Sequence, residues 1–238
     1  MADDRRPIDA AARALLCEFL SLFYEKGWVA GTGGGICAAL DGETLLMAPS
    51  GVHKERVAPD DLFVVDRSGR IVQAPARPGL RLTECGAIFC AVAERRRAGS
   101  VMHSHALSAV LAADLAEGAD RLPIRRLEML KGIRGCANAD SHAVPVIDNT
   151  AREPELAGRI REVLDRPEFA RAACVLVRDH GAYIWWRTSG RPSDTPRCIT
   201  SCSRRSSPGR ARRRRPFVDL PTPTRYNPPS LGRALSIR

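Results

Sequence analysis

Two histidines one residue apart carry the clearest chemistry in this sequence of 238 residues. His103 and His105 stand in "VMHSHALSAV", between a short apolar run and an alanine-rich stretch. Side chains at positions i and i+2 of a strand point to the same face, so both imidazoles can reach one point if this segment is extended. Neutral imidazole nitrogens are good ligands for a metal such as zinc. The pair therefore indicates either two ligands of one metal ion or two ordinary histidines, and the spacing alone does not distinguish these interpretations.

A third histidine strengthens the metal interpretation. His180 lies in a sharp "DHG" turn that follows an apolar run of strand length. Three protein ligands leave one coordination position open, which is typical of catalytic rather than structural zinc sites. The other two histidines, His53 and His142, are predicted to be surface or loop residues.

Two glycine-containing segments could hold an anion. They are "GTGGG" at 31–35 and "APSGVHK" at 48–54. Glycine permits positive φ, and successive free N–H groups can form a cradle for a phosphate. "GTGGG" follows a predicted helix and lacks the spacing of the dinucleotide-binding fingerprint. A tight turn between helix and strand remains the alternative interpretation.

The elements that must position these residues alternate between helix and strand. Residues 8–26 repeat apolar side chains at helical spacing and stop at Gly27. Further helices are predicted over 84–97, 107–115 and 154–164, and strands over 36–40, 44–48, 62–66, 100–103 and 142–149, with two more strands in 173–186. This alternation predicts an α/β domain over residues 1–187.

The positive charge is confined to the last fifth of the chain. Residues 188–238 hold 12 arginines and two aspartates, which accounts for the whole net charge of +10. This segment is rich in Ser, Pro and Arg and has no apolar period, so it is predicted to be a disordered tail. Its "RARRRR" run could bind nucleic acid through phosphates, which would make the domain a scaffold with a basic arm. The neutral body and the lack of interleaved aromatics argue against that role.

The composition and the order of residues at the start of the chain bear on the expected cellular location. No window contains the roughly 18 uninterrupted apolar residues of a membrane span. The start of the chain lacks the basic-then-apolar order of a signal peptide. The eight cysteines contain no CxxC pair and are predicted to be free thiols. A cytoplasmic protein with no membrane partner is expected.

Seven segments taken in order resemble the class II aldolase/adducin superfamily, and more closely its branch of methylthioribulose-1-phosphate dehydratases. The similarity runs over roughly residues 8–187. The segments are "GWVAGTGGGI" (27–36), "MAPSGVHKERVAPDDLFVVD" (47–66), "TECGAIF" (83–89), "GSVMHSHALSAV" (99–110), "LEMLKGIRG" (127–135), "VPVIDNT" (144–150) and "CVLVRDHGAYIWW" (174–186).

The resemblance implies a fold and a set of site residues. The fold is a three-layer α/β/α arrangement around a mixed, mostly antiparallel sheet. His103, His105 and His180 match the zinc ligands of the family, with one Zn²⁺ per subunit, and Glu128 matches the catalytic acid/base. Cys85 matches a cysteine that contacts substrate. The loops that hold the substrate phosphate correspond here to Gly33, Gly34, Ser50 and Gly51.

The implied reaction is dehydration of 5-methylthioribulose-1-phosphate to 2,3-diketo-5-methylthiopentyl-1-phosphate in methionine salvage, by a homo-oligomer that is often a tetramer. Aldolases of the fuculose or ribulose-phosphate type carry a glutamate where Cys85 stands. Because Glu84 is adjacent, a shift of one residue would restore that glutamate, so a sugar-phosphate aldolase remains the alternative. Without the resemblance, Glu128 would be interpreted as a carboxylate on a helix surface.

The resemblance ends after "YIWWR", where the family continues into a helical segment. The composition of residues 188–238 resembles that of a GC-rich gene read out of frame. We therefore predict a frameshift near residue 187, which would compromise assembly and activity because a missing helix leaves apolar surface uncovered.

Overall fold

A computed structural model describes residues 6–133 and 135–186, which belong to one compact unit. The predicted tail at 188–238, including Cys198 and Cys202, lies outside the described residues. None of the helices in the described ranges is both long and apolar enough to cross a membrane.

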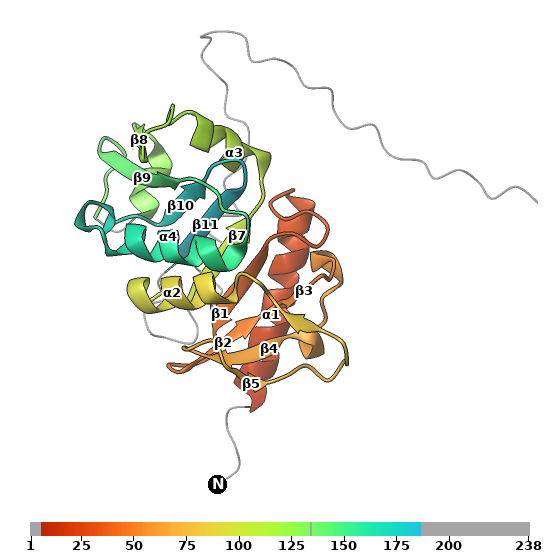
Figure 1. Ribbon diagram of the computed structural model, residues 1–238. Coiled ribbons are helices and arrows are strands. Elements are labelled where there is room, and N and C mark those ends of the chain that lie inside the picture. Colours follow the sequence, from red (N-terminus) through yellow and green to blue (C-terminus); the bar gives the residue numbers. More distant parts are fainter. Residues whose placement is uncertain (1–5, 134, 187–238) are drawn as a thin grey trace, which may run out of the picture. The chain divides into compact units, whose positions relative to one another are not determined.

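A nine-stranded sheet forms the centre of the described unit (Figure 1). The β9–β10 pair is parallel, and the other neighbouring pairs are antiparallel. In spatial order the strands are β5 (Ile71–Gln73), β4 (Phe63–Asp66), β2 (Thr44–Met47), β1 (Gly35–Ala39), β7 (Ser100–Ser104), β11 (Gly181–Trp186), β10 (Cys174–Val177), β9 (Ser141–Ile147) and β8 (Arg121–Arg125). A separate two-stranded ribbon joins β3 (Pro49–Ser50) to β6 (Arg81–Leu82).

Helices cover both faces of this sheet. Helices α2 (Gly86–Arg96) and α4 (Glu153–Asp165) lie side by side on one face (Figure 1). On the other face, α1 (Arg6–Glu25) packs on β1, and α3 (Leu107–Asp114) packs on β10 and β11. Short 3-10 helices complete the connections: η1 (Lys54–Arg56), η2 (Pro59–Asp61), η3 (Glu128–Gly132) and η4 (Pro167–Phe169).

Alternation along each strand sends side chains to the two faces in turn. On β7, Val101 packs with the α2 and α4 side chains, whereas Met102 packs with those of α1. On β10, Val175 faces α2 and α4, and Leu176 faces α3. Three apolar clusters therefore join the layers, and the predicted three-layer α/β/α fold with a mostly antiparallel sheet is confirmed.

The predicted helices and longer strands are present, with boundaries shifted by a few residues. Strands β3, β5, β6 and β8 were not predicted. Strands β3, β5 and β6 have only two or three residues, which is too short to show alternation, and β8 has a proline at its centre, which argues against a strand. The prediction for His142 was wrong. It lies within β9 and is 6% exposed, because its strand packs between β8 and β10. His53 is half exposed, as predicted.

Candidate metal centre

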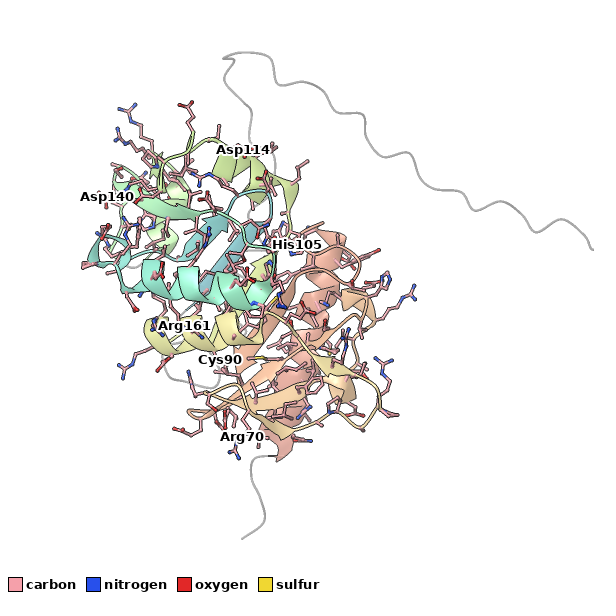
Figure 2. All side chains as sticks on the ribbon, viewed as in Figure 1. Arg70, Cys90, His105, Asp114, Asp140 and Arg161 are labelled. Atoms are coloured by element: carbon pink, nitrogen blue, oxygen red, sulfur yellow. The ribbon has the colours of Figure 1, made fainter. Side chains whose placement is uncertain are left out.

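The three predicted ligand histidines converge at the end of β7. His103 Nε2 lies 3.1 Å from His105 Nε2 and 3.1 Å from His180 Nε2. We call these three residues the histidine cluster. His103 is the last but one residue of β7 and is 1% exposed, whereas His105 follows the strand and is exposed. Figure 2 labels His105, near the junction of the N-terminal and C-terminal halves of the described unit.

Strand pairing explains why His180 reaches this point. Strand β11 pairs with β7 on the side opposite β1, and His180 stands in the turn just before β11. A Cβ at Gly181 would lie 2.0 Å from the carbonyl oxygen of Ser104, so only glycine allows the turn to approach β7 so closely. The "DHG" glycine therefore brings the third imidazole to the other two.

The imidazole of His103 is held from several sides. Its ring stacks on that of Tyr183, with centroids 4.2 Å apart and planes 14° apart. Its Nδ1 atom lies 3.0 Å from the Cys85 sulfur. Burial, followed by the neighbouring His105 and His180, lowers the pKa of His103 well below its ordinary value. Burial and His180 also lower the pKa of His105. These rings are therefore neutral near pH 7, the form that binds a metal.

The cluster fits a divalent metal ion. Each ring nitrogen of a neutral imidazole either donates one hydrogen bond or accepts one. His103 Nε2 therefore cannot form good hydrogen bonds with both of the Nε2 atoms that face it, unless an imidazole becomes protonated. Nitrogens bound to one tetrahedral zinc ion at about 2.0–2.1 Å lie about 3.3 Å apart. The observed separations are close to that value, and the three ligand atoms all lie within 4.8 Å of one another.

Asn149 was not predicted, yet it orients His180. Its Oδ1 atom accepts a hydrogen bond from His180 Nδ1 at 3.0 Å. Because Nδ1 then carries the proton, the lone pair of Nε2 faces the cluster. The only sequence signal was its place in "VIDNT", directly after a predicted strand.

Glu153 is a second residue that the sequence did not single out. It begins α4, and its Oε1 atom lies 3.4 Å from His180 Nε2. Its other oxygen accepts a hydrogen bond from the Tyr183 hydroxyl. With Cys85 and His103, it forms a second group whose ligand atoms lie within 4.8 Å of one another. An acidic residue in the first turn of a helix is too common to be a signal on its own.

Cys85 lies inside the site as a protonated thiol. It is the residue before α2 and is 6% exposed. Burial and the charge of Glu153 raise its pKa to about 12. Glu84 is exposed and lines a cavity beside the cluster. The thiol, not the neighbouring carboxylate, therefore contacts His103.

That cavity has a volume of about 660 Å³. His105, His180 and Glu153 are on its wall, together with Glu84, Asn149 and Arg152. A space of this size accommodates a small metabolite.

Glu128 is not among the residues that line this cavity. It begins η3 and is exposed. One carboxylate oxygen accepts from Lys131 Nζ at 2.6 Å, and the other accepts from Asn138 Nδ2 at 3.0 Å. The described chain therefore holds the predicted acid/base on its surface, outside the lining of the cavity beside the histidine cluster.

One of the two predicted phosphate loops, residues 31–35, lies against the histidines through its glycines. A Cβ at Gly33 would lie 2.8 Å from His105 Nδ1, and one at Gly34 would lie 2.7 Å from the His103 carbonyl oxygen. Ser50 forms part of β3, and Gly51 follows it in an exposed turn. Close contact with the histidine pair thus explains the glycines at 33 and 34.

Sequence comparison identifies relatives along most of the chain. A methylthioribulose-1-phosphate dehydratase from Gallus gallus is 39% identical over 183 residues, which cover 74% of each chain. One from Osmerus mordax is 40% identical over 183 residues, again 74% of each chain. A Zea mays protein named as a bifunctional methylthioribulose-1-phosphate dehydratase/enolase-phosphatase E1 is 37% identical over 186 residues. The chain covers 36% of that longer protein, and the aligned part is 73% of this chain.

Solved structures agree on the fold. An aldolase II superfamily protein from Pseudomonas syringae superposes with a TM-score of 0.60 at 20% identity, covering 83% of this chain and 72% of that one. The L-fuculose-1-phosphate aldolase from Thermus thermophilus gives 0.58 at 19% identity, with coverages of 82% and 90%. The family model described as "Class II Aldolase and Adducin N-terminal domain" matches residues 14–191. This chain belongs to that family.

Proposed function

We propose that this chain is a zinc-dependent methylthioribulose-1-phosphate dehydratase. The observation that carries the proposal is the convergence of three imidazole nitrogens in a chain that is 39–40% identical to relatives of that name. The contact between Cys85 and His103 supports the dehydratase over the aldolase, because the aldolases are expected to carry a carboxylate at that place.

His103, His105 and His180 are proposed to hold Zn²⁺ through their Nε2 atoms, with Asn149 orienting His180. A zinc ion held in this way acts as a Lewis acid toward a substrate carbonyl oxygen. The Cys85 thiol is proposed to fix the ring of His103 from its Nδ1 side and, as the resemblance implies, to contact the substrate. Gly33, Gly34, Ser50 and Gly51 are proposed to bind the phosphate, which supplies binding energy away from the reacting carbons.

Glu128 is proposed to act as the acid/base. As a carboxylate it takes the proton from C3 of the substrate, and as a carboxylic acid it protonates the C4 hydroxyl as that group leaves with the C–O electron pair. One water molecule is released, and the resulting enol tautomerises to the diketone.

Because Glu128 is exposed and does not line the cavity of its own copy, we propose that it serves the site of a second copy in a homo-oligomer. An exposed apolar row supports this placement. It is formed by Leu107, Leu111 and Leu115 of the α3 region, which follow one another at helical spacing. Leu127, directly before Glu128, is exposed as well. Exposed rows of this kind mark association surfaces.

Mixing two inactive variants tests the shared site. Glu128→Gln removes the acid/base, and His180→Asn removes one ligand. If sites form between copies, co-expressed oligomers contain some sites with both residues intact, so activity returns to a measurable fraction of that of the unmodified protein. Activity that stays at the level of the single variants would contradict a site shared between copies.

The test of the proposed reaction is an assay of the purified, zinc-loaded chain with methylthioribulose-1-phosphate. Formation of the diketone phosphate with loss of water supports the dehydratase. Glu84 favours one alternative, because its carboxylate lines the cavity next to Cys85. Cleavage of a carbon–carbon bond in a sugar phosphate, abolished by Glu84→Gln, would establish the aldolase instead.

A cytoplasmic location belongs to the same proposal. It is supported by the six described cysteines, all of which are free thiols, as in proteins of a reducing compartment.

A further inference from the structure

Lys54 is a buried cation beside the candidate metal centre that neither the sequence prediction nor the proposed reaction uses. Its side chain is 2% exposed. The ammonium donates to three main-chain carbonyl oxygens: Thr32 at 2.7 Å, Val52 at 3.1 Å and Pro49 at 3.4 Å. A buried charge is tolerated only when its hydrogen-bonding capacity is satisfied, and hydrogen bonds from charged donors are the stronger ones. Three acceptors match the three N–H bonds of the ammonium.

These acceptors belong to two separate segments of the chain. Thr32 lies in the glycine segment 31–35, whereas Pro49 and Val52 lie in the segment 49–52. The main-chain N–H of Lys54 also donates to the carbonyl oxygen of Gly31 at 3.2 Å. One residue therefore ties both segments together through its backbone and its side chain.

The same two segments contain the predicted phosphate-binding residues, and the glycine segment packs directly on the histidine cluster. Gly33 approaches His105, and Gly34 approaches His103, as described above. The charge of Lys54 acts on Cys85, His103 and His105. Because the Lys54 ammonium bonds to both segments and the glycine segment contacts the histidines, a displacement of this ammonium would shift the loops with respect to the metal centre.

The charge of Lys54 is only partly balanced. Its hydrogen-bond partners are carbonyl dipoles, and within residues 6–133 and 135–186 no carboxylate forms an ion pair with it. Glu55 acts on it through space, and the contacts of Glu55 itself are to His53 and Arg56. A buried positive charge without a carboxylate partner makes the electrostatic potential near these two segments more positive, which favours binding of an anion there.

We infer that Lys54 is a positioning residue that fixes the two phosphate loops to each other and to the histidine cluster, and whose charge favours a phosphate dianion there. The inference rests on the proposed function for the identity of the phosphate-carrying substrate. It does not require Lys54 to touch the substrate.

Lys54→Met tests the inference, because methionine keeps much of the apolar length and removes the charge. In the zinc-loaded protein, we expect KM and the inhibition constant of inorganic phosphate to rise about tenfold or more, since binding energy from a remote group is lost. Zinc content and kcat should change much less. An inhibition constant within twofold of that of the unmodified protein would overturn the inference.

Arg13→Met is the matched control. Arg13 is 7% exposed and, like Lys54, donates to main-chain carbonyls, here those of Pro59 and Leu62. We expect its substitution to lower Tm without changing the inhibition constant of phosphate. Equal changes of that constant in both variants would mean that Lys54 contributes only to general stability, and would refute the positioning role. Lys54→Arg retains the charge and should recover part of the phosphate affinity.

Hydrogen exchange of the unmodified zinc-loaded protein decides the question even if Lys54→Met does not fold. Inorganic phosphate should slow exchange of amides in 31–35 and in 50–54 with the same half-saturating concentration. Protection of one segment alone would contradict the coupling. If both segments are protected but methylthioribulose-1-phosphate is not dehydrated, the proposed function fails and the inference stands. If the protein dehydrates methylthioribulose-1-phosphate but phosphate protects only one segment, the inference fails and the proposed function stands.

Discussion

The histidine cluster and the 3-10 helix that carries Glu128 differ in how the fold supports them. His103 is buried in a central strand and is contacted by Cys85, Tyr183 and two other imidazoles. Glu128 lies on an exposed 3-10 helix, where its carboxylate accepts hydrogen bonds from Lys131 and Asn138. Metal ligands need geometry that is fixed before binding, whereas an acid/base can be supplied by a surface that becomes buried on assembly.

The largest effect is expected from removing a ligand of the histidine cluster. His103→Ala should abolish zinc binding and lower kcat/KM about 10³-fold or more, because Lewis-acid stabilisation contributes several kcal/mol. Zinc content by mass spectrometry and turnover of methylthioribulose-1-phosphate measure this. His142→Gln is the control, as a buried histidine outside the cluster that should keep its zinc. A His103→Ala protein with full zinc content would contradict the ligand assignment.

Substitution of the exposed Glu128 should lower activity without affecting zinc binding or stability. Glu128→Gln is expected to lower kcat about 10²-fold or more, in the range of general acid–base catalysis. Its zinc content and Tm should stay near those of the unmodified protein, since a surface ion pair contributes at most about 1 kcal/mol. Asp165→Asn is a matched control, because Asp165 is also an exposed, ion-paired carboxylate. Equal rates for Glu128→Gln and the unmodified chain would remove the acid/base role.

The hydrogen bond that orients His180 allows a further test of the metal site. Asn149→Ala removes the acceptor that sets the protonated nitrogen, so zinc affinity should fall about tenfold. Competition with a chromophoric chelator measures this change. Asn149→Asp keeps an acceptor oxygen and should bind zinc at least as well as the unmodified protein, and a tenfold loss there as well would contradict the orienting role.

The smallest effect concerns pH. In chelator-treated protein, the folded-state pKa of His103 lies below its ordinary value of 6.5, so the unfolded chain binds the proton more readily. The free energy of unfolding should therefore be highest above pH 6.5 and fall by about 1 kcal/mol per pH unit below it. Urea unfolding from pH 7.5 to 5 measures the slope. His103→Asn should flatten it, and an unchanged slope would exclude this histidine as its source.

The two regions also differ in what the sequence could predict. The histidine spacing and the "DHG" turn predict convergence, because strand geometry links local sequence to a shared face. Asn149, Glu153 and Lys54 reach the site through tertiary packing between segments distant in sequence, and no local pattern indicates that packing. His142 was assigned to the surface because the strand that buries it from one side, β8, gave no detectable pattern. The predicted tail and its frameshift origin concern residues that the structure does not describe, and resequencing the coding DNA would test that hypothesis.

The position of β7 has a consequence for when the metal can bind during folding. This strand pairs with β1 on one side and β11 on the other, and His103 stands opposite Gly35 and Tyr183 in the two pairings. Those partners come from opposite ends of the described chain, so contacts of long sequence separation must form before the three imidazoles meet. We therefore expect high-affinity zinc uptake to be a late event in refolding, one that reports completion of the sheet. A nascent chain that has not yet released β11 from the ribosome would have no centre to load.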